Sequence, residues 1–187
     1  MAEKTPRAKF AKPIPSGVAL YPRLNKPDTK FDAEGVYKVD VRYDPSDPEV
    51  ATWFEALKKF AIKHDKNPAN VGVKHEAGDD GAPTGMLIAK FKTAALWPDG
   101  TSRKPAIVDS RKQPLTEIVG GGSILRVNGD MSIYDGFGGG VTLGIKAVQV
   151  LKLVPYIAGV DDFNDEGDDD DDRGVNDDFD GSPEPEF

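Results

Sequence analysis

Alternating hydrophobic and polar residues run through much of the chain and predict a protein built mainly of β-strands. Residues 35–43 carry the clearest pattern, because their apolar side chains fall on every second position, at Tyr37, Val39, Val41 and Tyr43. Similar patterns predict further strands over residues 14–24, 85–97, 103–109, 123–134 and 141–154. Pro15 and Pro22 favour an edge position for the first of these, since proline cannot donate to a sheet ladder.

One segment has helical periodicity instead. Apolar residues recur at intervals of three and four over residues 49–65, and Ser46 as N-cap with Glu49 and Pro48 supplies a start signal. We expect Trp53 and Phe54 on this helix to lie in the core. The polar residues 67–84 and 110–119 are expected to be loops, and residues 135–140 a glycine-rich hairpin loop.

These elements predict a mainly β fold: an OB-fold-like antiparallel barrel of five to six strands, capped by one α-helix. Closure of the sheet removes unpaired edges. A β-sandwich is the alternative. We expect a flexible basic arm at residues 1–13, the barrel at 14–160, and a disordered acidic tail at 161–187.

Charge divides the chain into two unequal parts. The last 27 residues hold 14 acidic residues and one basic residue, a net charge of −13, whereas the whole chain carries −8. Residues 1–160 therefore hold 23 basic and 18 acidic residues, a net charge of +5. The tail has too few apolar residues to fold. It could serve only for solubility, or it could imitate a polyanion and occupy a basic groove.

Features of several enzyme and metal-binding classes are missing from the sequence. There is no Cys, and the two histidines, His64 and His75, lack metal-ligand spacing. The glycine clusters match neither nucleotide-binding motif, and Asp169 as the start of a calcium loop fails at Arg173. We expect no catalytic residues, no metal and no cofactor. Without a signal-peptide pattern or a membrane-spanning run, the protein is expected to be soluble and intracellular.

Cations and aromatic residues are interleaved on the predicted strands, which is the combination that single-strand binding requires. Phe91 and Tyr37 share faces with aliphatic residues, so core positions are favoured for both. Trp97, Tyr134 and Phe137 lie at strand ends or in a loop and are better stacking candidates. The residues expected to contact DNA are Lys38, Arg42, Lys90, Phe91, Lys92, Trp97, Arg103, Lys104, Arg111, Lys112, Arg126, Tyr134, Phe137 and Lys146.

Three short segments and the tail resemble the T-seven-type bacteriophage single-stranded DNA-binding proteins. The segments are GVYKVD at 35–40, VDS at 108–110 and GGGSILRV at 120–127, followed by an aspartate-rich tail that ends in Phe187. The resemblance implies an OB fold and a role in phage DNA replication, recombination and repair in the cytoplasm of the infected bacterium. It also implies that the tail contacts the phage DNA polymerase and helicase-primase, and it admits a homodimer. The tail residues expected to bind partners are Asp168, Asp169, Asp170, Asp171, Asp172, Phe179 and Phe187.

Two functions are therefore considered. The first is sequence-independent binding of single-stranded DNA without catalysis, with recruitment of replication proteins through the tail. The alternative is a protein-interaction adaptor that acts through the tail and uses the barrel as a scaffold. The net charge of residues 1–160 favours the first, because a scaffold has no need of cations beside strand aromatics.

Overall fold

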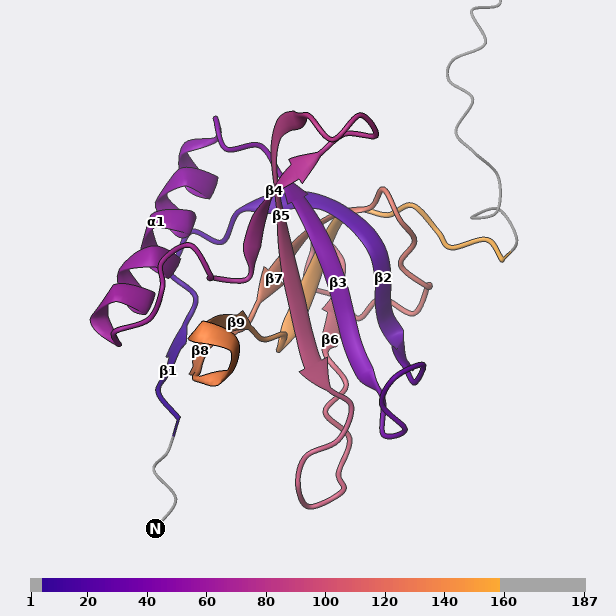
Figure 1. Ribbon diagram of the computed structural model, residues 1–187. Coiled ribbons are helices and arrows are strands. Elements are labelled where there is room, and N and C mark those ends of the chain that lie inside the picture. Colours follow the sequence, from indigo (N-terminus) through magenta and orange to yellow (C-terminus); the bar gives the residue numbers. More distant parts are fainter. Residues whose placement is uncertain (1–4, 159–187) are drawn as a thin grey trace, which may run out of the picture. The chain divides into compact units, whose positions relative to one another are not determined.

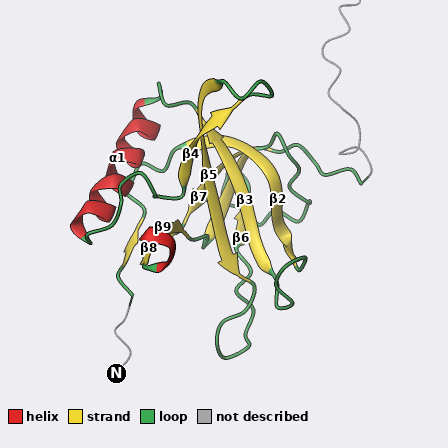
Figure 2. Cartoon of the chain, viewed as in Figure 1, coloured by secondary structure: helices red, strands yellow, loops and turns green. Residues whose placement is uncertain are grey.

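Ten β-strands and one α-helix form the part of the chain that the computed structural model describes, residues 5–158 (Figures 1 and 2). The predictions for the tail from Asp161 onward lie outside these residues. The strands are β1 (Arg7–Lys9), β2 (Ser16–Asp28), β3 (Val36–Tyr43), β4 (Val73–Ala77), β5 (Pro83–Ala94), β6 (Ala106–Val108), β7 (Ile124–Asn128), β8 (Asp130–Tyr134), β9 (Gly140–Leu143) and β10 (Ala147–Lys152). The helix is α1 (Pro48–Lys63), and a single 3-10 turn, η1 (Gly136–Gly138), joins β8 to β9. No helix among the described residues is long and apolar enough to cross a membrane.

The strands β2, β3 and β5 form the antiparallel centre of the sheet (Figure 1). On β3 the side chains of Tyr37, Val39, Val41 and Tyr43 are all buried, which confirms the inward face predicted from the alternating pattern. Lys38 and Arg42, between them, lie on the opposite face. The centre of the sheet therefore separates an apolar interior from a basic exterior.

A bent hairpin turns this sheet into a barrel. Its two arms are β7 continued by β8 and β9 continued by β10, which pair with each other along both halves. One arm pairs with β2 through β7, and the other meets β5 at a single bridge, Phe91↔Leu143. The ring of pairings closes through this hairpin, so the OB-type barrel predicted from the sequence is confirmed. The sheet is continuous rather than two packed layers, which excludes the β-sandwich.

Each arm of the hairpin is predicted from the sequence as one unbroken strand, and this prediction is wrong in a specific way. The bend divides the predicted strand 123–134 at Gly129 into β7 and β8. It divides the predicted strand 141–154 at residues 144–146 into β9 and β10. A Cβ on Gly129 would overlap the carbonyl oxygen of Gly144, so only glycine fits at the crossing. The close approach of the two arms is what allows the sheet to curl.

The prolines near β2 predict an edge position for this strand, and the pairing at its start contradicts that prediction. Residues Ser16–Val18 pair with β7, and β2 pairs with β3 from Val18 onward, so the strand lies between β7 and β3 in the sheet. Pro22 falls in the register shift between Leu20 and Arg23. The hydrogen-bond ladder between β2 and β3 is interrupted at this shift, so the missing N–H of Pro22 leaves no ladder hydrogen bond unmade.

The helix covers the core with its aromatic residues. Trp53 is 2% exposed and its ring lies 5.5–6.0 Å from those of Phe10, Tyr43 and Phe91, as predicted for a core residue. Burial raises the pKa of the Tyr43 hydroxyl far above its ordinary value. Phe54 is only partly buried, packed against the edge of this cluster. The helix runs from Pro48 to Lys63, against the predicted 49–65, and its N-cap is Asp47 rather than the predicted Ser46. The Asp47 carboxylate accepts from the Glu49 N–H at 2.8 Å.

Three local predictions need correction. Residues 7–10 of the expected flexible arm belong to the fold: β1 pairs with β8, and Phe10 is 5% exposed in the core. The expected loop 67–84 contains β4, which pairs with β5. The strand predicted over 103–109 shortens to β6, which pairs in parallel with β10.

Candidate nucleic-acid interface

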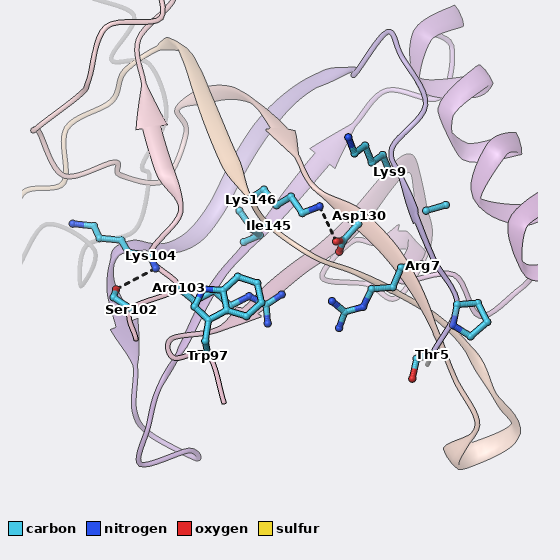
Figure 3. A pocket seen from close by; sticks show the side chains of 12 residues that line it. Thr5, Arg7, Lys9, Trp97, Ser102, Arg103, Lys104, Asp130, Ile145 and Lys146 are labelled. Atoms are coloured by element: carbon cyan, nitrogen blue, oxygen red, sulfur yellow. Dashed lines mark hydrogen bonds and ion pairs between the residues drawn. The ribbon is translucent and has the colours of Figure 1, made fainter. Parts of the chain in front are cut away.

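A groove of about 740 Å³ opens between β1, the loop after β5 and the bend of the hairpin. Figure 3 shows Arg7 and Lys9 on one side, Trp97 with Arg103 on the other, and Lys146 with Asp130 between them. Ile145 is buried at the base. The lining residues are Thr5, Pro6, Arg7, Ala8, Lys9, Trp97, Ser102, Arg103, Lys104, Asp130, Ile145 and Lys146.

Trp97 is the aromatic ring of the groove and remains 44% exposed. Its loop is held by a tight turn, in which the Trp97 N–H donates to the Thr101 carbonyl and the Gly100 N–H donates to the Trp97 carbonyl, both at 2.8 Å. The Arg103 guanidinium lies over the indole, 4.2 Å from its centroid, in a cation–π contact. This contact holds the ring in place while leaving apolar surface on which a base could stack.

Among the described residues, five cations line the groove against one carboxylate. The carboxylate belongs to Asp130, which is 7% exposed and pairs with Lys146 at 3.1 Å. Asp130 faces Lys9 across the β1–β8 ladder. The excess positive charge is what a phosphate backbone requires, and the ring supplies the second ingredient of a single-strand site.

The structure brings four of the predicted DNA-contacting residues together in this groove: Trp97, Arg103, Lys104 and Lys146. Three others, Lys38, Lys90 and Lys92, lie on the outer face of the central sheet. There Lys38 bonds to the Asp28 carboxylate and lowers the pKa of that group, chiefly through the hydrogen bond. Lys90 lies 3.5 Å from Asp40.

The remaining predicted residues lie apart from the groove. Arg42 bonds to Glu76 at 2.9 Å, and Arg126 is 3.9 Å from Glu49. Arg111 and Lys112 lie in an exposed turn between Asp109 and Gln113. For these four, and for Tyr134 on β8 and the exposed Phe137, DNA contact stays a prediction.

Phe91 is the predicted contact that the structure overturns. Its ring is 1% exposed and packs against Trp53 and Phe10 inside the barrel. Side chains alternate between the two faces of a strand, so Phe91 lies on the same face of β5 as Leu87 and Ala89. The sequence favoured a core position for Phe91 on this ground.

Arg7 and Lys9 are the groove cations that the sequence interpretation missed. Composition alone assigns them to a flexible arm. The alternation of Arg7, Ala8, Lys9 and Phe10 is a short strand pattern, and it would have revealed both cations on one face.

The fold and the groove together define an OB-type barrel with a cationic and aromatic cleft. Solved structures with this fold include gp2.5, a single-stranded DNA-binding protein encoded by bacteriophage T7, at 24% sequence identity and a TM-score of 0.59, covering 89% of this chain and 97% of that one. They also include the single-stranded DNA-binding protein of bacteriophage Enc34, at 17% identity. Its C-terminal truncation has a TM-score of 0.55, and its complex with single-stranded DNA 0.54; both matches cover 83% of this chain. No family model and no curated protein matches the sequence.

Proposed function

We propose that this protein binds single-stranded DNA without sequence preference and without catalysis. The observation that carries the proposal is the convergence of an exposed indole and five cations in one groove of the described residues. Cations track the phosphates, and every base offers a face on which the ring can stack. The likeness in fold to phage proteins of this activity supports the same conclusion.

We also propose a biological setting, which the resemblance to phage single-stranded DNA-binding proteins supports. We place the protein in phage DNA replication, recombination and repair, where it covers single strands in the infected cell. The acidic tail would recruit the phage DNA polymerase and helicase-primase, with Phe187 as the apolar anchor and the aspartates steering association. Among residues 5–158, no group of acidic or histidine side chains is arranged to hold a metal ion.

The test is a titration of single- and double-stranded oligonucleotides at two salt concentrations. We expect tighter binding to single strands, with affinity falling steeply as salt rises. Equal affinity for both forms would contradict the stacking model.

Charge reversal then locates the site. Reversing Arg103 and Lys104 together should weaken binding strongly, because both line the groove. Reversing Lys59 and Lys63 is the matched control, since both are exposed on α1, line no part of the groove and are not among the predicted DNA contacts. Equal losses from the two double variants would show that DNA responds to net charge rather than to this groove.

A further inference from the structure

Asp130 is the one charged residue that is buried among residues 5–158. It begins β8, where the next residue, Met131, points into the core and Asp130 lies on the opposite face, in the groove around Trp97. A buried carboxylate destabilises a fold unless cations or hydrogen bonds compensate it. Packing of the core therefore gives no reason for a charge at this position.

Two cations of the groove flank the Asp130 carboxylate (Figure 3). The Lys146 ammonium lies 3.1 Å from one of its oxygens, and Lys9 is the register partner of Asp130 across the β1–β8 ladder. Directly opposed residues of an antiparallel pair share a face, with Cβ atoms about 4.5–5.5 Å apart. The carboxylate therefore neutralises part of the charge that a phosphate would meet in the groove.

The backbone of the bend encloses this carboxylate. The Gly144 N–H donates to the Asp130 carbonyl oxygen at 2.7 Å, and a Cβ on Gly144 would lie only 2.5 Å from the other carboxylate oxygen. Of the ion pairs among the described residues, this one has the most buried carboxylate, with the Asp130 side chain 10% exposed against 52% for Lys146. A ligand can thus reach the ammonium, while the carboxylate stays beneath it.

We propose that Asp130 is an internal counter-ion that competes with a DNA phosphate for Lys146 and so limits the affinity of the groove for single strands. The inference rests on the proposed DNA-binding function and concerns the regulation of the same site. A phosphate that binds Lys146 must share it with a carboxylate that already pairs with it. Lys146 therefore adds less to binding than its place in the groove suggests, and the bound strand is released more readily.

The experiment titrates an oligothymidylate over a salt series. Asp130→Asn removes the charge and keeps the shape of the side chain, so Lys146 gains about one phosphate contact, and the logarithm of the binding constant should fall more steeply with that of the salt concentration, by about 0.7. The variant should accordingly bind about eightfold more tightly than the parent at about 50 mM salt and about threefold more tightly at about 200 mM. Asp130→Ser removes the same charge with a smaller side chain and should show the same gain, so the test does not depend on the fit of the amide.

Glu55→Gln is the matched control. Its carboxylate also pairs with a lysine, Lys58 at 2.8 Å, but both residues lie on α1 and neither lines the groove. The variant changes the net charge by the same amount and should keep the affinity and salt dependence of the parent. Adding Lys146→Gln to Asp130→Asn should abolish the gain, because no ammonium is then released.

The outcomes separate this inference from the proposed function. If Asp130→Asn and Asp130→Ser bind no more tightly than the parent, while charge reversal of Arg103 and Lys104 impairs binding, Asp130 has only a structural role and the proposed function stands. An equal gain from Glu55→Gln, or a gain that persists without Lys146, would also overturn the competition. If the parent does not bind the oligonucleotide at any salt concentration, both proposals fail.

Discussion

For single residues, burial assigns different roles to the two tryptophans. Trp53 is 2% exposed among three other rings, whereas Trp97 is 44% exposed under the Arg103 guanidinium. A buried ring contributes to the stability of the fold, and an exposed ring in a cationic groove is available to a ligand.

The tryptophans should therefore respond oppositely to truncation. Trp97→Ala should cost about 1–3 kcal/mol of DNA-binding free energy with little change in the free energy of unfolding. Trp53→Ala should reduce the free energy of unfolding by about 3–5 kcal/mol, as for a core aromatic. Both quantities are measured for each variant, by oligonucleotide titration and by denaturant unfolding. A Trp97→Ala protein that unfolds as easily as Trp53→Ala would contradict the assignment.

Among the secondary-structure elements, the bent hairpin and β1 build the groove. The bend at Gly129 and Gly144 carries Asp130, Ile145 and Lys146 to the base of the groove. Phe10 anchors β1 in the core, which holds Arg7 and Lys9 along the side. The cations are thus placed by packing contacts made elsewhere on the same elements.

The bend should be intolerant of even one methyl group. In Gly129→Ala the new Cβ would overlap the Gly144 carbonyl, a backbone group that cannot move without opening the hairpin. We expect a loss of about 3 kcal/mol or more in the free energy of unfolding, at the upper end of overpacking effects.

Gly121→Ala is the matched control for the bend. Gly121 lies just before β7 and has no positive φ. Apart from Gly121 and its two chain neighbours, no atom of the described residues comes within 4 Å of the position that a methyl group would take there. The variant should unfold like the parent in the same denaturant titration. Similar losses for the two variants would show that the close approach at Gly129 is not the cause.

Over the molecule as a whole, charge is segregated along the chain. Residues 1–160 carry +5 and residues 161–187 carry −13. We expect a polyanionic tail joined to a cationic domain to be present at high effective concentration and therefore to compete with DNA for the same cations.

Removal of the tail should therefore tighten DNA binding. Deleting residues 161–187 should raise affinity most at low salt, and the gain should shrink as salt screens both anions. Phe187→Ala is the control, because it keeps every charge and should bind DNA like the full chain. Affinities are measured for all three proteins over a salt series. A truncated protein that binds no more tightly at low salt would rule out competition.

Local periodicity and composition were enough to predict one group of features. The inward face of β3 follows from apolar residues at every second position, and the burial of Trp53 on α1 follows from apolar residues with a period of about 3.6. Both periods can be recognised within about ten residues of sequence. The segregation of charge follows from composition alone. The order of the predicted strands and the single helix favoured an OB-type barrel over a β-sandwich, and the resemblance implied the same fold.

Which chemical groups meet depends instead on the folded chain. Arg7, Trp97 and Lys146 are distant in sequence and converge because the hairpin bends and β1 pairs with β8. Tyr21 is exposed because a bulge reverses the order of faces along β2. Each outcome depends on contacts between segments far apart in the chain, and no local pattern contains that information.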